Sequence, residues 1–239
     1  MLKNYKISEP FFEYGPKCYM YGDTLLKMAK GLEKLAIKYN VDVVLDIPDT
    51  EIYNIAHNVD TKRVHVYSQH MDSIPVGRGM GRTLPEAVKA AGAVGVMLNH
   101  AEHKLTLDEI EKAIKRADEV GLATMVCADS VEEVKAIARL APNILVAEPT
   151  ELIGTGKPAD KAYVDEVIRV IKEINPDIKP FPSAGISKGE DCYNIIKAGS
   201  SASGCSSAIA KAAEPLKLAE EMIAAVRKAY DERKSNGKE

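Results

Sequence analysis

The sequence contains no Trp, only three Phe among 239 residues, and four Cys that stand far apart: Cys18, Cys127, Cys192 and Cys205. Without a CxxC pair, these cysteines offer neither the spacing of a zinc site nor the framework of a disulfide-rich protein, so we expect free thiols. No apolar run approaches the roughly 18 residues that a membrane span needs, and the polar N-terminus does not read as a signal peptide. These absences predict a cytoplasmic protein.

An excess of positive charge is also missing. The formal net charge is −3 and the isoelectric point is near 6.0, so no basic surface field is available to displace counterions from a nucleic acid. Clusters of metal-ligating residues are lacking as well, and we expect neither a metal nor an organic cofactor. We therefore expect no nucleic acid and no membrane among the partners.

What the sequence does contain is an alternation that occurs eight times. Short apolar runs, several of them apolar throughout as in parallel strands covered on both faces, alternate with longer amphipathic segments. We predict strands at residues 10–15, 41–47, 63–68, 93–98, 122–127, 144–147, 178–184 and 201–207. We predict helices at residues 23–38, 50–58, 84–91, 106–119, 130–139, 160–174, 187–197 and 214–232.

Three of the predicted helices begin with a capping-box pattern, in which a hydroxyl and a carboxylate satisfy free backbone amides: Thr83 to Glu86, Thr106 to Glu109, and Ser130 to Glu133. Eight uninterrupted strand–helix units predict a single domain over residues 1–239. Its expected fold is a (β/α)8 TIM barrel, in which eight parallel strands are ringed by helices. A doubly wound open sheet is the structural alternative.

Three ionisable residues fall just beyond predicted strand ends, where a barrel collects its chemistry. They are Lys17, His100 and Glu148. Each has a structural interpretation on its own, as a solvated or hydrogen-bonded side chain. Together they supply a carboxylate base, a donor for a developing oxygen charge and a fixed cation, which is the set that proton transfer beside a carbonyl requires. Two Gly-rich loops, 76–82 and 149–158, lie on the same face.

The segment Glu148-Pro-Thr-Glu-Leu-Ile-Gly-Thr-Gly156 resembles the lid motif of triosephosphate isomerases in their archaeal form, and Asn99-His100-Ala-Glu102 resembles their Asn-His-Ser-Glu. Further matches extend the resemblance from about residue 9 to about residue 230. The resemblance implies a small phosphorylated sugar as the substrate. The implied reaction converts dihydroxyacetone phosphate and glyceraldehyde 3-phosphate into each other through an enediolate, in glycolysis and gluconeogenesis.

The same resemblance implies that Glu148 is the base, that neutral His100 moves protons on the two oxygens, and that Lys17 stabilises the enediolate. This family is the standard example of a glutamate base that works with a neutral histidine. Loop 149–157 would close over the substrate. Two groups of residues would assist: Glu102 and Asn99 would support the site, and Gly154, Ser187, Ser207 and Ala208 would bind the phosphate through backbone amides.

The chain departs from the family's pattern at several places. Gly15 stands where the family has an asparagine, and the second strand ends Leu-Asp46-Ile-Pro48 where the family has an Ala-Pro-Gln-like end. In the final strand, the Ser-rich run 200–207 replaces an apolar run, which predicts a roomier and more polar phosphate pocket. These changes leave two alternatives open: an isomerase for another short phosphorylated ketose or aldose, such as a tetrulose phosphate, and a catalytically weak binding homologue.

Loop 76–82 carries Met80 where the family has a threonine that inserts into a neighbouring subunit. An exposed Met flanked by Gly and Arg would be an unusual apolar surface on a monomer. We therefore predict a homo-oligomer, either a dimer or a tetramer.

Overall fold

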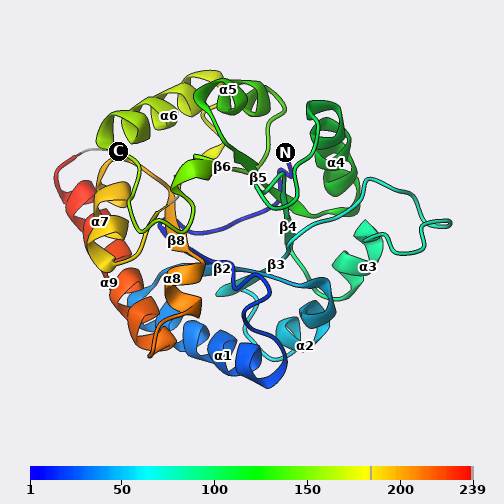
Figure 1. The fold of residues 1–239 in the computed structure, drawn as a ribbon, viewed down its shortest axis with the longest axis horizontal. Helices are drawn as coiled ribbons and strands as arrows, with labels where there is room; N and C mark the ends of the chain where they lie inside the picture. Colours follow the sequence, from blue (N-terminus) through cyan, green and yellow to red (C-terminus); the bar gives the residue numbers. More distant parts are fainter. Residues whose placement is uncertain (184, 238–239) are drawn as a thin grey trace.

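Eight parallel strands form the centre of the molecule, in a computed structural model that describes residues 1–183 and 185–237 (Figure 1). They are β1 (Phe11–Tyr14), β2 (Asp42–Ile47), β3 (Val64–Ser68), β4 (Gly95–Leu98), β5 (Ala123–Ala128), β6 (Ile144–Ala147), β7 (Lys179–Pro182) and β8 (Ala202–Cys205). They are hydrogen-bonded in the order β7-β6-β5-β4-β3-β2-β1-β8. The Ser201 N–H, just before β8, donates to the Pro180 carbonyl of β7 at 3.0 Å and brings the two ends of this order together. The predicted barrel is therefore confirmed, and the alternative of an open sheet is wrong.

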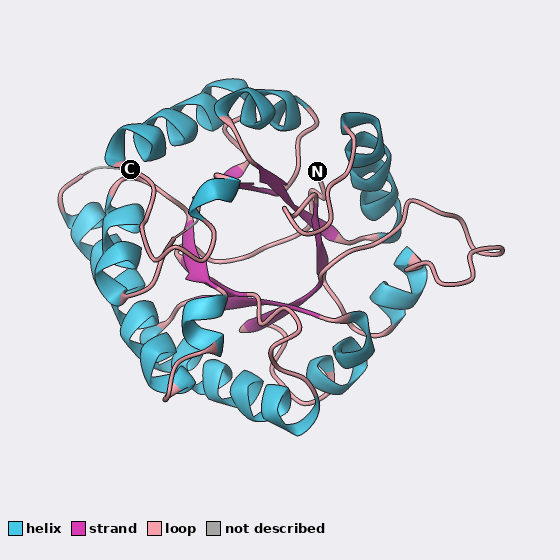
Figure 2. Ribbon diagram, in the orientation of Figure 1, coloured by secondary structure: helices cyan, strands magenta, loops and turns pink. Residues whose placement is uncertain are grey.

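Helices surround the barrel as an outer ring (Figure 2). They are α1 (Gly22–Tyr39), α2 (Ile52–Ala56), α3 (Pro85–Ala90), α4 (Leu107–Val120), α5 (Val131–Arg139), α6 (Lys161–Ile174), α7 (Gly189–Lys197), α8 (Ser207–Ala210) and α9 (Pro215–Ser235), with 3-10 turns η1 (Asp49–Glu51) and η2 (Thr150–Leu152). No helix within the described ranges is both long and apolar enough to cross a bilayer.

Most element bounds agree with the sequence prediction to within a few residues. The predicted helix 50–58 divides into η1 and α2, and the predicted eighth strand ends at Cys205 because the chain turns there into the unpredicted short helix α8. Ala184, the last residue of the predicted seventh strand, and residues 238–239 lie outside the described part of the chain.

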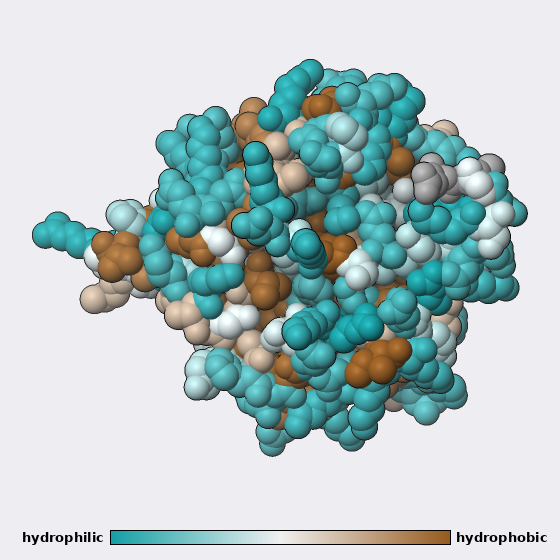
Figure 3. Space-filling view, turned by 180° about the vertical axis from the view of Figure 1, so that it is seen from behind, coloured by the Kyte–Doolittle hydropathy of each residue, from teal (hydrophilic) through white to brown (hydrophobic). Residues whose placement is uncertain are grey.

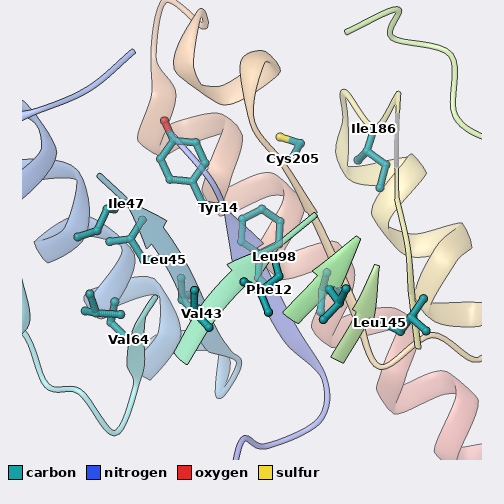
Figure 4. Packing of buried hydrophobic residues seen from close by; sticks show 14 of the residues in the cluster. Phe12, Tyr14, Val43, Leu45, Ile47, Val64, Leu98, Leu145, Ile186 and Cys205 are labelled. Atoms are coloured by element: carbon teal, nitrogen blue, oxygen red, sulfur yellow. The ribbon is translucent and has the colours of Figure 1, made fainter. Parts of the chain in front are cut away.

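Two apolar layers explain why the strands are apolar on both faces. Successive side chains of a strand point to opposite sides, so Phe11 and Val44 pack inside the barrel with Phe181. Their neighbours Phe12 and Val43 pack outward against the helices, as Figure 4 shows. Since each fully buried large apolar side chain contributes about 1.5–3 kcal/mol, these two layers hold the strand ends in place.

One of the three predicted capping boxes is complete. The Thr106 hydroxyl accepts a hydrogen bond from the Glu109 N–H at 3.3 Å, and the Thr106 N–H donates to the Glu109 carboxylate at 2.7 Å. At α5, the Ser130 hydroxyl accepts from the Glu133 N–H at 3.2 Å. The Glu133 carboxylate does not return this bond, because it accepts from the Asp129 N–H instead.

The predicted box at Thr83 is wrong. Helix α3 begins at Pro85 with Leu84 as its N-cap, and no side chain caps it. The physical reason is competition from other carboxylates: the Thr83 N–H donates to Asp72 at 2.7 Å and the Thr83 hydroxyl donates to Asp49 at 2.7 Å. Pro85 at the first helical position has no N–H that needs a cap.

We expect Thr106→Ala to lower the free energy of unfolding by about 0.5–2 kcal/mol, because it removes a side-chain N-cap. Urea unfolding followed by circular dichroism measures this change. Thr106→Ser is the matched control, since it keeps the capping hydroxyl and should retain most of the stability. An equal loss in both variants would show that the methyl group, and not the cap, carries the effect.

Candidate active site

A cavity of about 650 Å³ opens at the carboxyl ends of the strands. Lys17 follows β1, His100 follows β4 and Glu148 follows β6, and all three side chains line this cavity. The barrel therefore brings together three residues that lie far apart in the sequence. Their convergence agrees with the sequence-based expectation that they face one mouth.

His100 is held in one tautomer. The Glu102 N–H donates to His100 Nδ1 at 3.1 Å, so Nδ1 is the acceptor and the proton of a neutral ring lies on Nε2. Burial lowers the pKa of His100, and the nearby charge of Lys17 lowers it further. The ring is therefore neutral near pH 7, and its Nε2–H is available to the cavity as a hydrogen-bond donor.

Glu148 combines burial with proximity to His100. Its Oε2 lies 3.8 Å from His100 Nε2, which is too long for a direct hydrogen bond. Burial raises the pKa of Glu148 to about 7, while Lys17 opposes the rise. A carboxylate with a pKa near neutrality is well matched to accept and return a proton at ordinary pH.

Lys17 has a constrained backbone and a directed side chain. Its φ of 49° lies in the left-handed region, which is uncommon for a residue other than glycine. Its ammonium group pairs with Glu102 Oε1 at 2.6 Å, and only 21% of the side chain is exposed. The hydrogen bond from Lys17 lowers the pKa of Glu102. This ion pair turns Lys17 across the cavity mouth and away from bulk solvent.

Asn99, next to His100 in the chain, is not among the residues that line the cavity. It is buried, also with a left-handed φ of 58°. Its amide donates to the Cys127 carbonyl at 2.9 Å, and its side-chain oxygen accepts from the Leu105 N–H at 2.9 Å. These bonds anchor the loop that carries His100 and Glu102 to strand β5.

The four residues expected to bind a phosphate all line the cavity: Gly154, Ser187, Ser207 and Ala208. Ser207 and Ala208 form the first turn of α8, where backbone N–H groups have no intrahelical acceptor. At β8, the interior residue Gly204 sends no side chain into this space. The Ser187 N–H and hydroxyl both donate to the Asp191 carboxylate, at 2.9 and 3.2 Å, so a phosphate would compete with Asp191 there.

Sequence reasoning missed two further groups that line the cavity. Glu13 and Asp46 lie in its wall, and the rings of His70 and His103 stack at a centroid distance of 3.9 Å. A signal for the first group was present, because a carboxylate within an otherwise apolar strand must face one of two buried layers. Across the described residues, no group of three or more His, Cys, Asp or Glu side chains is placed to hold a metal ion.

Comparisons with known proteins match this chain to one family over most of its length. The family model described as triosephosphate isomerase matches residues 15–180. The triosephosphate isomerase of Sulfurisphaera tokodaii is 38% identical over 216 residues, which cover 90% of this chain and 93% of the relative. That of Saccharolobus solfataricus is 38% identical, covering 85% of this chain and 89% of the relative, and that of Methanobacterium bryantii is 39% identical, covering 86% and 91%.

The raised pKa of Glu148 predicts how stability depends on pH. Burial disfavours the charged form of Glu148 and so lowers the stability of the folded chain when this carboxylate is ionised. This loss of stability is absent below the pKa that Glu148 has in the unfolded chain and complete above its pKa of about 7 in the folded chain. We therefore expect Glu148→Gln to be more stable than the parent by roughly 3 kcal/mol at about pH 8, and equal to it at about pH 4. Urea unfolding at both pH values measures the difference. A stability difference between variant and parent that is the same at both pH values would contradict the raised pKa of Glu148.

Proposed function

We propose that this chain, which belongs to the triosephosphate isomerase family, interconverts dihydroxyacetone phosphate and glyceraldehyde 3-phosphate through an enediolate. Membership of the family makes it an aldose–ketose isomerase that acts on a small phosphorylated sugar. This reaction belongs to glycolysis and gluconeogenesis. The observation that supports the proposal most is the placement of Glu148, neutral His100 and Lys17 around one cavity.

In this proposal Glu148 removes a proton from the carbon beside the carbonyl, and the C–H electrons form the double bond of the enediolate. His100 donates its Nε2 proton to the carbonyl oxygen, and the positive field of Lys17 stabilises the charge that develops there. Glu148 then returns its proton to the neighbouring carbon, while the second hydroxyl returns a proton to His100. The net reaction moves one proton between the two carbons and exchanges one between the two oxygens, and it returns Glu148 and His100 to their starting protonation states.

Loop 149–157 acts as a lid. Its residues from Gly154 to Lys157 are exposed, and its first turn is tied to the barrel by the Thr150 N–H, which donates to Asp129 at 2.7 Å. Closing this loop excludes water from the reacting carbons. The phosphate binds to Gly154, Ser187, Ser207 and Ala208, and this remote contact supplies the binding energy that orients the reacting carbons.

A second candidate substrate is another short phosphorylated ketose or aldose, such as a tetrulose phosphate. One observation favours it: the wall of the cavity carries two carboxyl groups, those of Glu13 and Asp46. A triose phosphate bound through its phosphate and its reacting carbons has few hydroxyl groups left for such polar contacts.

We expect Glu148→Gln to lower kcat by roughly 10²–10⁴-fold or more, since it removes the base and keeps the size of the side chain. A coupled assay with glyceraldehyde 3-phosphate measures the rate. Glu166→Gln is the control, because Glu166 is an exposed carboxylate on α6, outside the cavity and the lid, and should leave the rate unchanged. Wild-type turnover by Glu148→Gln would exclude Glu148 as the base.

We further propose that the chain assembles as a homo-oligomer through the segment around Met80. Met80 is fully exposed, at 104% of its reference surface, and Val76 is exposed at 71%. This segment projects from the barrel between β3 and α3 (Figure 2), and apolar atoms lie on it at the left edge of Figure 3. An apolar tip on a projecting loop fits a pocket of a second subunit.

Sedimentation of the wild-type chain at micromolar concentration should therefore give a dimer or a tetramer. Met80→Arg should shift the population to a smaller species, because it buries an unpaired charge at the contact. Ile37→Arg serves as the control, since Ile37 is an exposed apolar residue on α1, away from the projecting loop. A wild-type chain that sediments as a monomer would remove the proposal.

A further inference from the structure

Two carboxyl groups lie side by side in the cavity wall. Glu13 on β1 and Asp46 on β2 are 7% and 3% exposed, and both line the cavity that contains Glu148. Glu13 stands two residues after Phe11, and Asp46 stands two residues after Val44. Both Phe11 and Val44 point into the barrel interior, so the two carboxyl groups lie on the same side of their strands. We call Glu13 and Asp46 the carboxyl pair.

The carboxyl pair occupies space that two glycines leave open. A Cβ atom at Gly15 would lie 2.7 Å from Asp46 Oδ1 and 2.9 Å from Glu13 Oε1. A Cβ atom at Gly204 would lie 2.7 Å from Glu13 Oε2. These separations are shorter than real carbon–oxygen contacts, so a Cβ atom at Gly15 would displace the pair, while at Gly204 a Cβ atom would also lie 2.2 Å from the backbone carbonyl oxygen of Glu13. Oxygens of both carboxyl groups therefore lie within 3.0 Å of the position that a Cβ atom of Gly15 would take.

Among the described residues, no lysine or arginine forms an ion pair with the carboxyl pair. Lys17, the charged group that acts on both, gives its hydrogen bond to Glu102. Asp46 Oδ1 is buried and accepts no hydrogen bond from an N–H or O–H group of the described residues. Burial raises the pKa of both groups, and the charge of Asp46 raises that of Glu13 further. Two adjacent buried carboxylates cannot both stay charged, so they share a proton.

Such a pair lowers stability, because apolar side chains of similar volume pack at least as well as buried polar groups that lack partners. With one shared proton, the pair presents one O–H donor and several acceptor lone pairs to the cavity. A cation would be repelled by Lys17. Hydroxyl groups, which both donate and accept, match the pair without adding charge.

We propose that the carboxyl pair is a hydroxyl-binding subsite, which selects phosphosugars with at least one hydroxymethylene group more than a triose phosphate. This inference rests on the isomerase function proposed above, and the same proton transfer between neighbouring carbons by Glu148 serves the longer substrate. The pair lies on β1 and β2, whereas the proposed phosphate contacts follow β6, β7 and β8. A cavity of about 650 Å³ lies in the range that accommodates drug-sized ligands, so a longer sugar has room.

The test compares kcat/KM for glyceraldehyde 3-phosphate with kcat/KM for erythrose 4-phosphate and threose 4-phosphate, using the full chain and following ketose formation by proton NMR. The wild type should convert at least one four-carbon sugar. Glu13→Ala and Asp46→Ala should each lower the ratio of four-carbon to three-carbon kcat/KM by about 10- to 100-fold, since each removes a hydrogen bond to an ionised or proton-sharing group. Glu13→Gln and Asp46→Asn, which keep the shape, replace the alanine variants if those are insoluble.

Asp42→Asn is the matched control, because Asp42 begins the same strand and lies outside this cavity. It should leave the substrate ratio unchanged. Wild-type turnover of glyceraldehyde 3-phosphate alone would overturn the subsite and leave the proposed isomerase intact. Equal losses on both substrates would also overturn it, because the pair would then act on Glu148 and not on the added hydroxyl. If the wild type converts none of the sugars, the isomerase proposal fails and the subsite fails with it.

Discussion

The ion pair between Lys17 and Glu102, at 2.6 Å, is the interaction on which the arrangement of the cavity mouth depends. It joins the end of β1 to the loop after β4, and Lys17 itself has a left-handed backbone conformation. The backbone of the same Glu102 sets the tautomer of His100. The charge of Lys17 also lowers the pKa of His100 and limits the rise at Glu148. Lys17 and Glu102 therefore contact His100 or act on it and on Glu148 electrostatically, while burial is the larger influence on the pKa of each.

The barrel separates the parts that stabilise the molecule from the parts that carry charge. Inside the barrel and between the strands and helices, apolar layers supply the free energy of burial. At the carboxyl ends of the strands, buried carboxyl groups such as Glu148 and Asp46 reduce it. A carboxylate that must be charged to accept a proton, and buried to exclude water, is destabilising by nature. The apolar layers make that arrangement tolerable.

The departures from the family's pattern become connected once the structure is known. Gly15, Asp46 and the Ser- and Gly-rich eighth strand appear in the sequence as three separate changes. In the barrel, β1 pairs with both β2 and β8, so Gly15 and Gly204 lie on either side of the space that Glu13 and Asp46 fill. Two changes that look independent along the chain therefore meet in the structure, since a Cβ atom at Gly15 would lie 2.7 Å from Asp46 Oδ1.

The sequence by itself determined the eight strand–helix units, because alternation of apolar strands with amphipathic helices is a local pattern. It also indicated Lys17, His100 and Glu148, since residues just beyond parallel strands must share one face. Tertiary structure alone decided the rest. Thr83 was predicted to cap a helix, but Asp49 and Asp72 compete for its hydrogen bonds from distant parts of the chain. The sequence likewise showed Glu13 and Asp46 as carboxylates in apolar strands but not that they meet, because strand register and the space beside Gly15 are set by contacts between segments and not by any one segment.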